Sequence, residues 1–305
     1  MAITAAMVKE LREKTGAGMM DCKKALEEAG GDLNRAVDIL REKGLAKAAK
    51  KSDRIAAEGL VSIAISNDNK VAAITEINSE TDFVAKNDEF KSFVQDVTQI
   101  VLNSQAQDVE QLLEEKYLDT DSTVKEVLNS KIATIGENMN IRRFEKFEIN
   151  DGQVAGYVHG GGKIGVLVKL ETSSESQEVI SLGKDIAMQV AAMNPKYISQ
   201  KDVDQEYIAH EKEILMQQAL NEGKPADIVE KMVMGRLNKQ LKEVCLLDQS
   251  FVKNPDITVG QLVKEYENKL GVSINISDVV RFEVGEGIEK KEENFAEEVA
   301  KQLKN

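Results

Sequence analysis

The residues that come nearest to a recognisable chemical motif are 160–163, which read GGGK. A glycine-rich turn that ends in lysine can wrap the phosphates of a nucleotide, but such a loop joins a strand to a helix and has Ser or Thr after the lysine. Here the apolar run Ile164–Val168 follows directly and is typical of a second strand. The glycines therefore predict the turn of a β-hairpin rather than a phosphate site.

The chain has two histidines and two cysteines, and neither pair is placed for catalysis or metal binding. His159 precedes the glycine turn without a nucleophile motif, and His210 lies in a glutamate-rich helical segment. Cys22 and Cys245 lack ligand-like spacing, so we interpret them as reduced thiols of a cytoplasmic protein. The sequence therefore predicts no catalytic residue, no metal site and no cofactor, and the protein is not expected to be an enzyme.

One polar stretch is better suited to binding another protein. Residues 76–90 read EINSETDFVAKNDEF; the apolar run Val71–Ile77 predicts a buried strand before them, and a helical apolar pattern starts at Phe90. Asp82 and Phe83 fall in the bend between these elements. A large aromatic side chain at such a bend is either tucked beneath it or offered to a partner, and the surrounding residues alone favour the tucked interpretation.

An internal repeat changes this interpretation. At a shift of 93 residues, the strand and helix segments within residues 70–100 fall on residues 163–193, with apolar residues at matching positions. Phe83, however, falls on Ser176. Because a core residue is expected to recur as an apolar one, the repeat favours an exposed and functional Phe83.

Each copy of the repeat predicts a strand, a turn, a second strand, a bend and a helix. Gly59 in the first copy matches Gly156 only at a shift of 97 residues, which predicts a shorter hairpin in the second copy. The predicted fold class is α+β, with two similar subdomains that each contain a small antiparallel sheet covered by helices. We place these subdomains at residues 55–140 and 141–286.

Helical modules flank and interrupt the two copies. Residues 1–54 predict a three-helix bundle with a G-A-G-M turn, similar to a ubiquitin-associated bundle, whose last helix ends at Gly44. The basic segment 41–54 is expected to be a solvated linker, with a nucleic-acid or ribosome contact as the alternative. Residues 202–244 predict a protruding antiparallel helical hairpin, and residues 287–305 predict a C-terminal helix after a glycine hinge.

The composition limits the class of partner. The 305 residues are 42% hydrophobic and 30% charged, and their formal net charge is −13. That charge argues against broad nucleic-acid binding and suits a partner with a basic or neutral surface. The sequence shows no signal peptide, and no apolar run approaches the roughly 20 residues of a membrane span. We therefore expect a cytoplasmic protein that binds neither membranes nor nucleic acid.

Three stretches, taken together, resemble one family. They are LREKTGAGMMDCKKAL at 11–26, SETDFVAKNDEF at 79–90 and YVHGGGKIGVLV at 157–168. In this order they resemble bacterial elongation factor Ts, the nucleotide-exchange factor of elongation factor Tu, and the resemblance covers essentially the whole chain. It implies a guanine-nucleotide exchange factor of translation elongation that acts by protein contact alone, without touching the nucleotide.

The resemblance also implies site residues. Thr81, Asp82, Phe83 and Val84 match family positions that enter the GTPase domain of elongation factor Tu and displace Mg²⁺ contacts there. Further partner contacts are implied for a scattered set: Arg12, Met19, Met20, Ile135 and His159. Core packing and docking are both reasonable for the two methionines, and we expect Met19 in the core and Met20 at the surface.

A non-catalytic adaptor is the alternative function. In that case the ubiquitin-associated-like bundle would hold a helix of some other protein. The two functions differ in their partner, so thermal stabilisation by a GTPase would favour the exchange factor over the adaptor.

Overall fold

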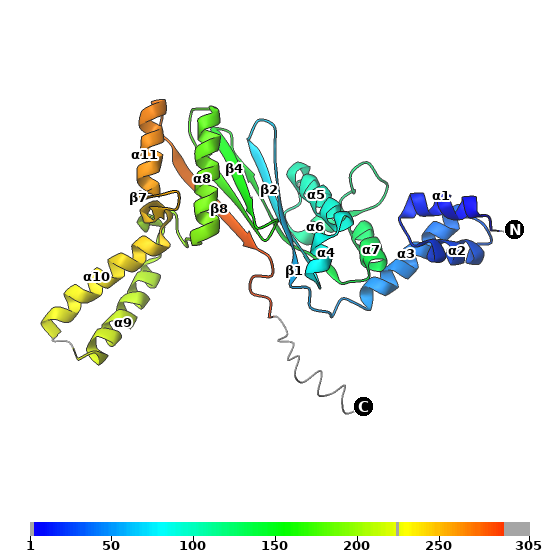
Figure 1. Cartoon of the computed structure of the whole chain (residues 1–305), viewed down its shortest axis with the longest axis horizontal. Coiled ribbons are helices and arrows are strands. Elements are labelled where there is room, and N and C mark those ends of the chain that lie inside the picture. Colours follow the sequence, from blue (N-terminus) through cyan, green and yellow to red (C-terminus); the bar gives the residue numbers. More distant parts are fainter. Residues whose placement is uncertain (1–2, 224–225, 290–305) are drawn as a thin grey trace.

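The computed structural model describes residues 3–223 and 226–289. The chain begins with three helices, as the sequence predicted: α1 (Ala5–Thr15), α2 (Met19–Glu28) and α3 (Leu33–Ala49) (Figure 1). Local signals set their ends, because the Thr4 hydroxyl caps α1, Gly16 ends it in the left-handed conformation, and the Asp32 carboxylate caps α3. The likeness to a ubiquitin-associated bundle and the domain boundaries stay predictions.

The third helix is longer than the sequence predicted. It continues through Gly44 to Ala49, so the basic segment 41–54 is mostly helical and the predicted end at Gly44 is wrong. Gly44 is buried where α3 packs on α7 (Val124–Ile135), and a Cβ atom there would lie 3.9 Å from Cβ of Ala133. Packing on a second helix stabilises α3 across a residue that lowers helix propensity.

Two three-stranded antiparallel sheets form the body of the protein, which confirms the α+β class. The first has the order β1-β2-β3, with strands Glu58–Ile65, Val71–Ser79 and Met139–Glu148. The second has the order β4-β5-β8, with strands Gly152–His159, Ile164–Glu171 and Asn275–Glu283. A small ribbon pairs β6 (Ser250–Phe251) with β7 (Asn254–Thr258).

The two sheets pack against each other, and helices cover their outer faces (Figure 1). Val61 and Ile74 of the first sheet share a buried cluster with Leu167 and Phe282 of the second. On the outer faces, α5 (Asp88–Asn103) packs on β1 and β2, and α8 (Gln177–Met193) packs on β4 and β5. The central strands β2 and β5 are therefore buried on both faces, which explains their continuous apolar sequences.

The internal repeat is present, with one correction. Gly59 pairs with Asn78 as Gly152 pairs with Glu171, so the first strands also align at the shift of 93 residues. The predicted shift of 97 and the shorter second hairpin are wrong. Both glycines lie beside the point where the central strand changes register with its other neighbour. The φ angle is 136° at Gly59 and 153° at Gly152. A Cβ atom would lie 2.2 Å from a carbonyl oxygen of the central strand at Gly59, and 2.1 Å from one at Gly152.

The segment between the two copies is partly helical. Residues 108–140 contain two separate helices, α6 (Val109–Glu114) and α7, before β3 begins. A short helix, α4 (Asp82–Lys86), precedes α5, and α11 (Val259–Leu270) precedes β8.

The predicted helical hairpin is confirmed. It consists of α9 (Gln205–Asn221) and α10 (Ala226–Val244) and projects from the body on the side away from the bundle (Figure 1). Leu215, Val233 and Leu237 lie in its own buried core, which lets it extend without support from the sheets.

The described part of the chain stops at Glu289, so most of the predicted C-terminal helix, 287–305, lies outside it. Within the described ranges, no helix combines the length and apolar character that crossing a membrane requires.

Candidate partner-binding site

The bend after β2 presents Phe83 to solvent. Thr81 caps the five-residue helix α4, with its hydroxyl accepting a hydrogen bond from the Val84 amide (3.4 Å). Asn87 then interrupts the helix with extended backbone and caps α5 by accepting from the amides of Glu89 and Phe90. The Phe83 side chain is 79% exposed. The exposure that the repeat comparison predicted is confirmed, and the tucked interpretation is wrong.

The residues beneath this bend are buried. Val84 is 8% exposed and Ala85 is 5% exposed, and both join the core that contains Phe90 and Phe93. Val84 was predicted as a partner contact, but its burial means that it anchors the bend instead. We call residues 81–83 the tip; its exposed side chain is presented by a packed base.

The charge at the tip is partly compensated. Asp82 Oδ2 lies 2.7 Å from Lys86 Nζ one helical turn later, and the hydrogen bond from Lys86 lowers the pKa of Asp82. The Lys86 ammonium also lies 5.9 Å from the centre of the Phe83 ring. The pair is exposed and therefore adds little stability, so both side chains are available to a partner.

Two other predicted positions lie at the ends of a helix and a strand. Ile135 is half-buried at the end of α7, two residues before Glu137, which hydrogen-bonds Thr81. His159 is exposed at the end of β4, where its Nδ1 lies 2.9 Å from the Tyr157 hydroxyl. The glycine turn after it closes a hairpin, as predicted, so no phosphate loop exists there.

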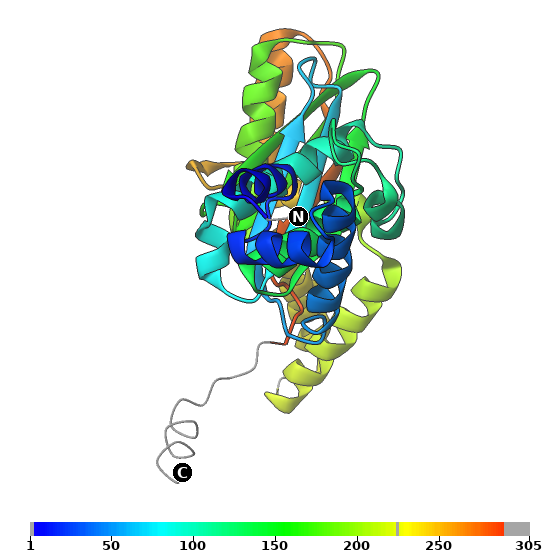
Figure 2. The same cartoon turned by 90° about the vertical axis from the view of Figure 1, so that its right-hand side faces the viewer.

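The remaining predicted positions lie on the bundle, apart from the tip. Arg12 is exposed on α1, and both methionines at the start of α2 are exposed, Met19 by 59% and Met20 by 62%. The placement of Met19 in the core is therefore wrong. Figure 1 shows α1 and α2 at one end of the molecule, away from the sheets, and Figure 2 views the molecule from that end, with the bundle in front.

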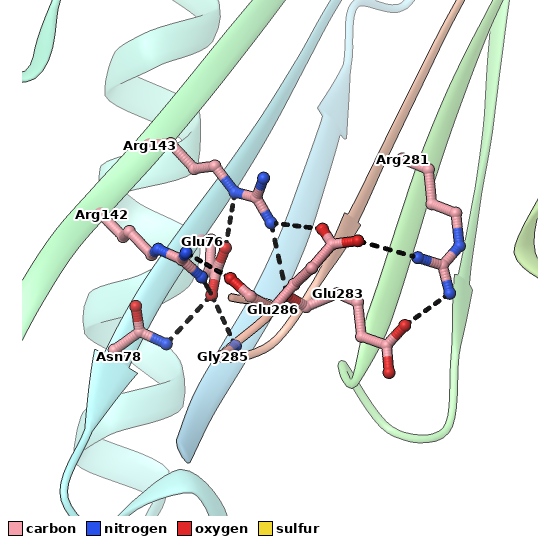
Figure 3. A network of polar contacts seen from close by, with 8 residues as sticks. All are labelled: Glu76, Asn78, Arg142, Arg143, Arg281, Glu283, Gly285 and Glu286. Carbon is pink, nitrogen blue, oxygen red and sulfur yellow. Dashed lines mark hydrogen bonds and ion pairs between the residues drawn. The ribbon is translucent and has the colours of Figure 1, made fainter. Parts of the chain in front are cut away.

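A buried carboxylate that the sequence analysis missed lies on β2 directly before the tip. Glu76 is 0% exposed. Its carboxylate accepts hydrogen bonds from Asn78 (3.1 Å), Arg142 (3.0 Å), Arg143 (2.7 Å) and the amide of Gly285 (2.8 Å), as Figure 3 shows. The only signal in the sequence was a glutamate inside an apolar run, because its arginine and glycine partners are distant in the chain.

This network joins the two sheets. Burial raises the pKa of Glu76, but the four hydrogen bonds outweigh it and hold the pKa below its ordinary value. Arg143 also pairs with Glu286 (3.1 Å; Figure 3). Its guanidinium carbon lies 4.2 Å from the centre of the Phe282 ring. The ionised Glu76 thus links the chain after β8 to β2 of the first sheet, the strand that leads into the tip.

The cysteines are not placed for reaction. Both are buried, and burial raises the pKa of the Cys22 thiol and raises that of Cys245 to about 11. Both thiols are therefore neutral near pH 7 and poor nucleophiles. Among residues 3–223 and 226–289, no group of three or more His, Cys, Asp or Glu side chains is arranged to hold a metal ion.

The structure therefore combines a repeated α+β core with one exposed aromatic side chain at the tip. A family model described as Elongation factor TS matches residues 80–286. The chain is 65% identical to Elongation factor Ts of Clostridioides difficile (strain 630) over 302 residues, 99% of each chain. It is 58% identical to Elongation factor Ts of Clostridium novyi (strain NT) over 302 residues, again 99% of each chain. The chain therefore belongs to the elongation factor Ts family, whose members are elongation factors of protein biosynthesis.

Proposed function

We propose that this protein binds elongation factor Tu and promotes GDP release by inserting Asp82 and Phe83 of the tip into the GTPase domain. Displacement of Mg²⁺ contacts in that domain is the proposed local effect. The observation that supports this most is the 79% exposure of Phe83 on a bend whose base is buried and capped. A large aromatic side chain held in water by a packed base is a typical anchor for a protein interface.

The proposed mechanism is linkage between two binding equilibria. A partner that binds the nucleotide-free GTPase more tightly than the nucleotide-bound form must weaken nucleotide binding by the same factor. A GTPase holds its nucleotide through backbone amides around the phosphates and through Mg²⁺. A side chain that disturbs the Mg²⁺ contacts therefore accelerates release without any chemical step on the part of this protein.

Further contacts would come from two surfaces. Ile135 lies at the end of α7 and His159 at the end of β4, while Arg12, Met19 and Met20 lie exposed on the bundle. These positions extend the contact beyond the tip and supply the affinity that a single side chain cannot.

The experiment is to measure the release of fluorescently labelled GDP from elongation factor Tu with and without this protein. Phe83→Ala is expected to lower the stimulated rate by about tenfold or more, as for an interface hot spot. Met193→Ala is the matched control, because Met193 is an exposed apolar residue (49%) on the helix of the second copy. Unchanged stimulation by Phe83→Ala contradicts the role of the tip, and binding without faster release favours an adaptor that uses the exposed methionines of the bundle.

A further inference from the structure

We propose that Glu137 is a positioning residue for the tip and that its turn, residues 136–138, sets both the tip and the bundle relative to the body. The inference rests on the proposed exchange function and adds to it a residue that does not itself face the partner.

The first observation is the contact between Glu137 and Thr81. One carboxylate oxygen accepts from the Thr81 amide (2.9 Å), and the other accepts from the Thr81 hydroxyl (2.7 Å). The hydroxyl has a single proton, so donating it to Glu137 leaves its lone pairs for the amide of Val84 (3.4 Å). Glu137 thus fixes the orientation of the capping group that begins α4, the helix that carries Phe83.

The second observation is the adjacent pairing of Glu80 with Asn138. The Glu80 carboxylate accepts a hydrogen bond from the Asn138 amide (2.5 Å), so both residues before Asp82 are held by the same turn. Hydrogen bonds to carboxylates are stronger than those between neutral groups, and two adjacent ones leave the start of α4 little freedom. The tip is consequently oriented from outside its own segment.

The third observation is that the turn also receives the chain leaving the bundle. The Asn138 side chain, 2% exposed, donates to the carbonyl oxygens of Arg54 (2.7 Å) and Ser52 (3.3 Å). The Lys51 ammonium donates to the carbonyl oxygen of Gly136. The same three-residue turn therefore holds both the tip and the chain that leads from the bundle, the two surfaces proposed to contact the partner.

The second copy of the repeat is built differently at this place. Ser174, the equivalent of Thr81 at the shift of 93 residues, accepts with its hydroxyl from the amide of Ser176 (3.3 Å) inside its own bend. The Ser176 hydroxyl is buried without a hydrogen-bond partner in the described structure. A bend of this repeat can therefore form without a carboxylate from another turn, which separates the role of Glu137 from the needs of the fold.

The test begins with Glu137→Gln, which keeps the size of the side chain but replaces one acceptor oxygen with an amide donor facing another donor. Hydrogen–deuterium exchange of the α4 amides is expected to rise by about tenfold, as their cap is weakened. Stimulated GDP release at saturating protein is expected to fall by about tenfold, with the half-saturating concentration changed by less than about threefold. Glu115→Gln is the matched control, because Glu115 accepts from the Ser104 hydroxyl (2.5 Å) elsewhere in the same subdomain.

A double variant decides whether Glu137 acts through the tip. Glu137→Gln in a Phe83→Ala background is expected to cause no further loss of exchange, whereas multiplied losses overturn the proposal. An unchanged rate of hydrogen–deuterium exchange at the α4 amides of Glu137→Gln also overturns the proposal. If the unmodified protein fails to accelerate GDP release, the proposed function fails, and the α4 amides alone then decide the positioning role. Should Glu137→Gln fold poorly, Glu137→Asp, which keeps the charge but shortens the reach, replaces it.

Discussion

The two copies of the repeat differ most at the bend after their central strands. In the second copy, α8 runs from Gln177 to Met193 without interruption. In the first copy the equivalent chain is divided at Asn87, whose backbone is extended (ψ 132°) and whose side chain caps α5. The exposed Phe83 thus lies in the copy whose helix is divided into two capped helices. The copy whose helix is uninterrupted has a serine, Ser176, at the equivalent position.

The copies also differ in one buried position of the central strand. Glu76 is fully buried and hydrogen-bonded to two arginines, whereas its equivalent at the shift of 93 residues, Lys169, is half-buried with its ammonium 5.9 Å from the centre of the Phe147 ring. The first copy thus carries both the tip and a charged anchor beneath it. The second copy has neither, which makes it an internal control for every change made in the first.

The largest effect is expected where the copies agree. Phe93→Ala, in the core beneath the tip, is expected to lower the free energy of unfolding by roughly 3–5 kcal/mol, and the equivalent Ile186→Ala by roughly 2–5 kcal/mol. Both side chains are buried (1% and 0% exposed) against the central strands. Denaturant titrations measure this; a small effect at either position would break the equivalence of the two helices.

A large effect is also expected where the copies differ. Glu76→Ala leaves two arginines without their buried partner and is expected to lower the free energy of unfolding by roughly 3–5 kcal/mol. Lys169→Ala is the matched change in the second copy and is expected to cost less than about 1 kcal/mol, because Lys169 is half-buried and makes no comparable network. Equal losses in a denaturant titration would contradict the difference between the copies.

The same carboxylate gives a dependence on pH. Because the pKa of Glu76 is lower in the folded protein than its ordinary value of 4.5, its contribution to stability is complete above that value and is lost as the pH falls below it. Unfolding midpoints measured between pH 7 and pH 3 are therefore expected to fall more steeply below about pH 4.5 for the unmodified protein than for Glu76→Ala. Parallel curves for the two proteins would show that Glu76 is not responsible.

An intermediate effect is expected at the paired glycines. Gly59→Ala and Gly152→Ala each place a Cβ atom against a carbonyl oxygen at a positive φ angle, so each is expected to cost roughly 1–3 kcal/mol. Gly161→Ala is the control, because its Cβ atom would meet nothing within 4 Å although its φ angle is also positive. Denaturant midpoints of the three variants separate the clash from the backbone strain that they share.

The smallest effect on stability is expected at the tip. Phe83→Ala is expected to change the free energy of unfolding by no more than about 0.5 kcal/mol, because the side chain is 79% exposed. Denaturant titration beside the Phe93→Ala variant measures the contrast. A loss comparable to that of Phe93→Ala would mean that Phe83 belongs to the core.

Much of the fold could be predicted because its signals are local or repeated. Helical spacing and caps located the three helices of the bundle and the hairpin, and the mismatch of Phe83 with Ser176 predicted its exposure. Comparison of individual residues failed for the first strands, because it aligned Gly59 with Gly156 instead of Gly152. There the requirement for glycine is a close approach of two strands, which only the register shows.

The parts that could not be predicted depend on contacts between distant residues. Glu76 meets Gly285 from 209 residues away, and Thr81 meets Glu137 from 56 residues away. No periodicity in the sequence pairs such residues. The end of α3 was predicted wrongly for the same reason, since Gly44 is buried against α7, a helix that is distant in the sequence.

The continuation of α3 past Gly44 has a thermodynamic consequence for recognition. A flexible tether must be ordered when the module it carries docks, and that loss of conformational entropy weakens binding. Here the connection is already helical through Ala49, and Arg41 pairs with Glu126 of α7 (3.0 Å). Under the proposed function, this helical connection preorganises the bundle and the tip for the same partner, and contact at one of them raises the effective concentration of the other.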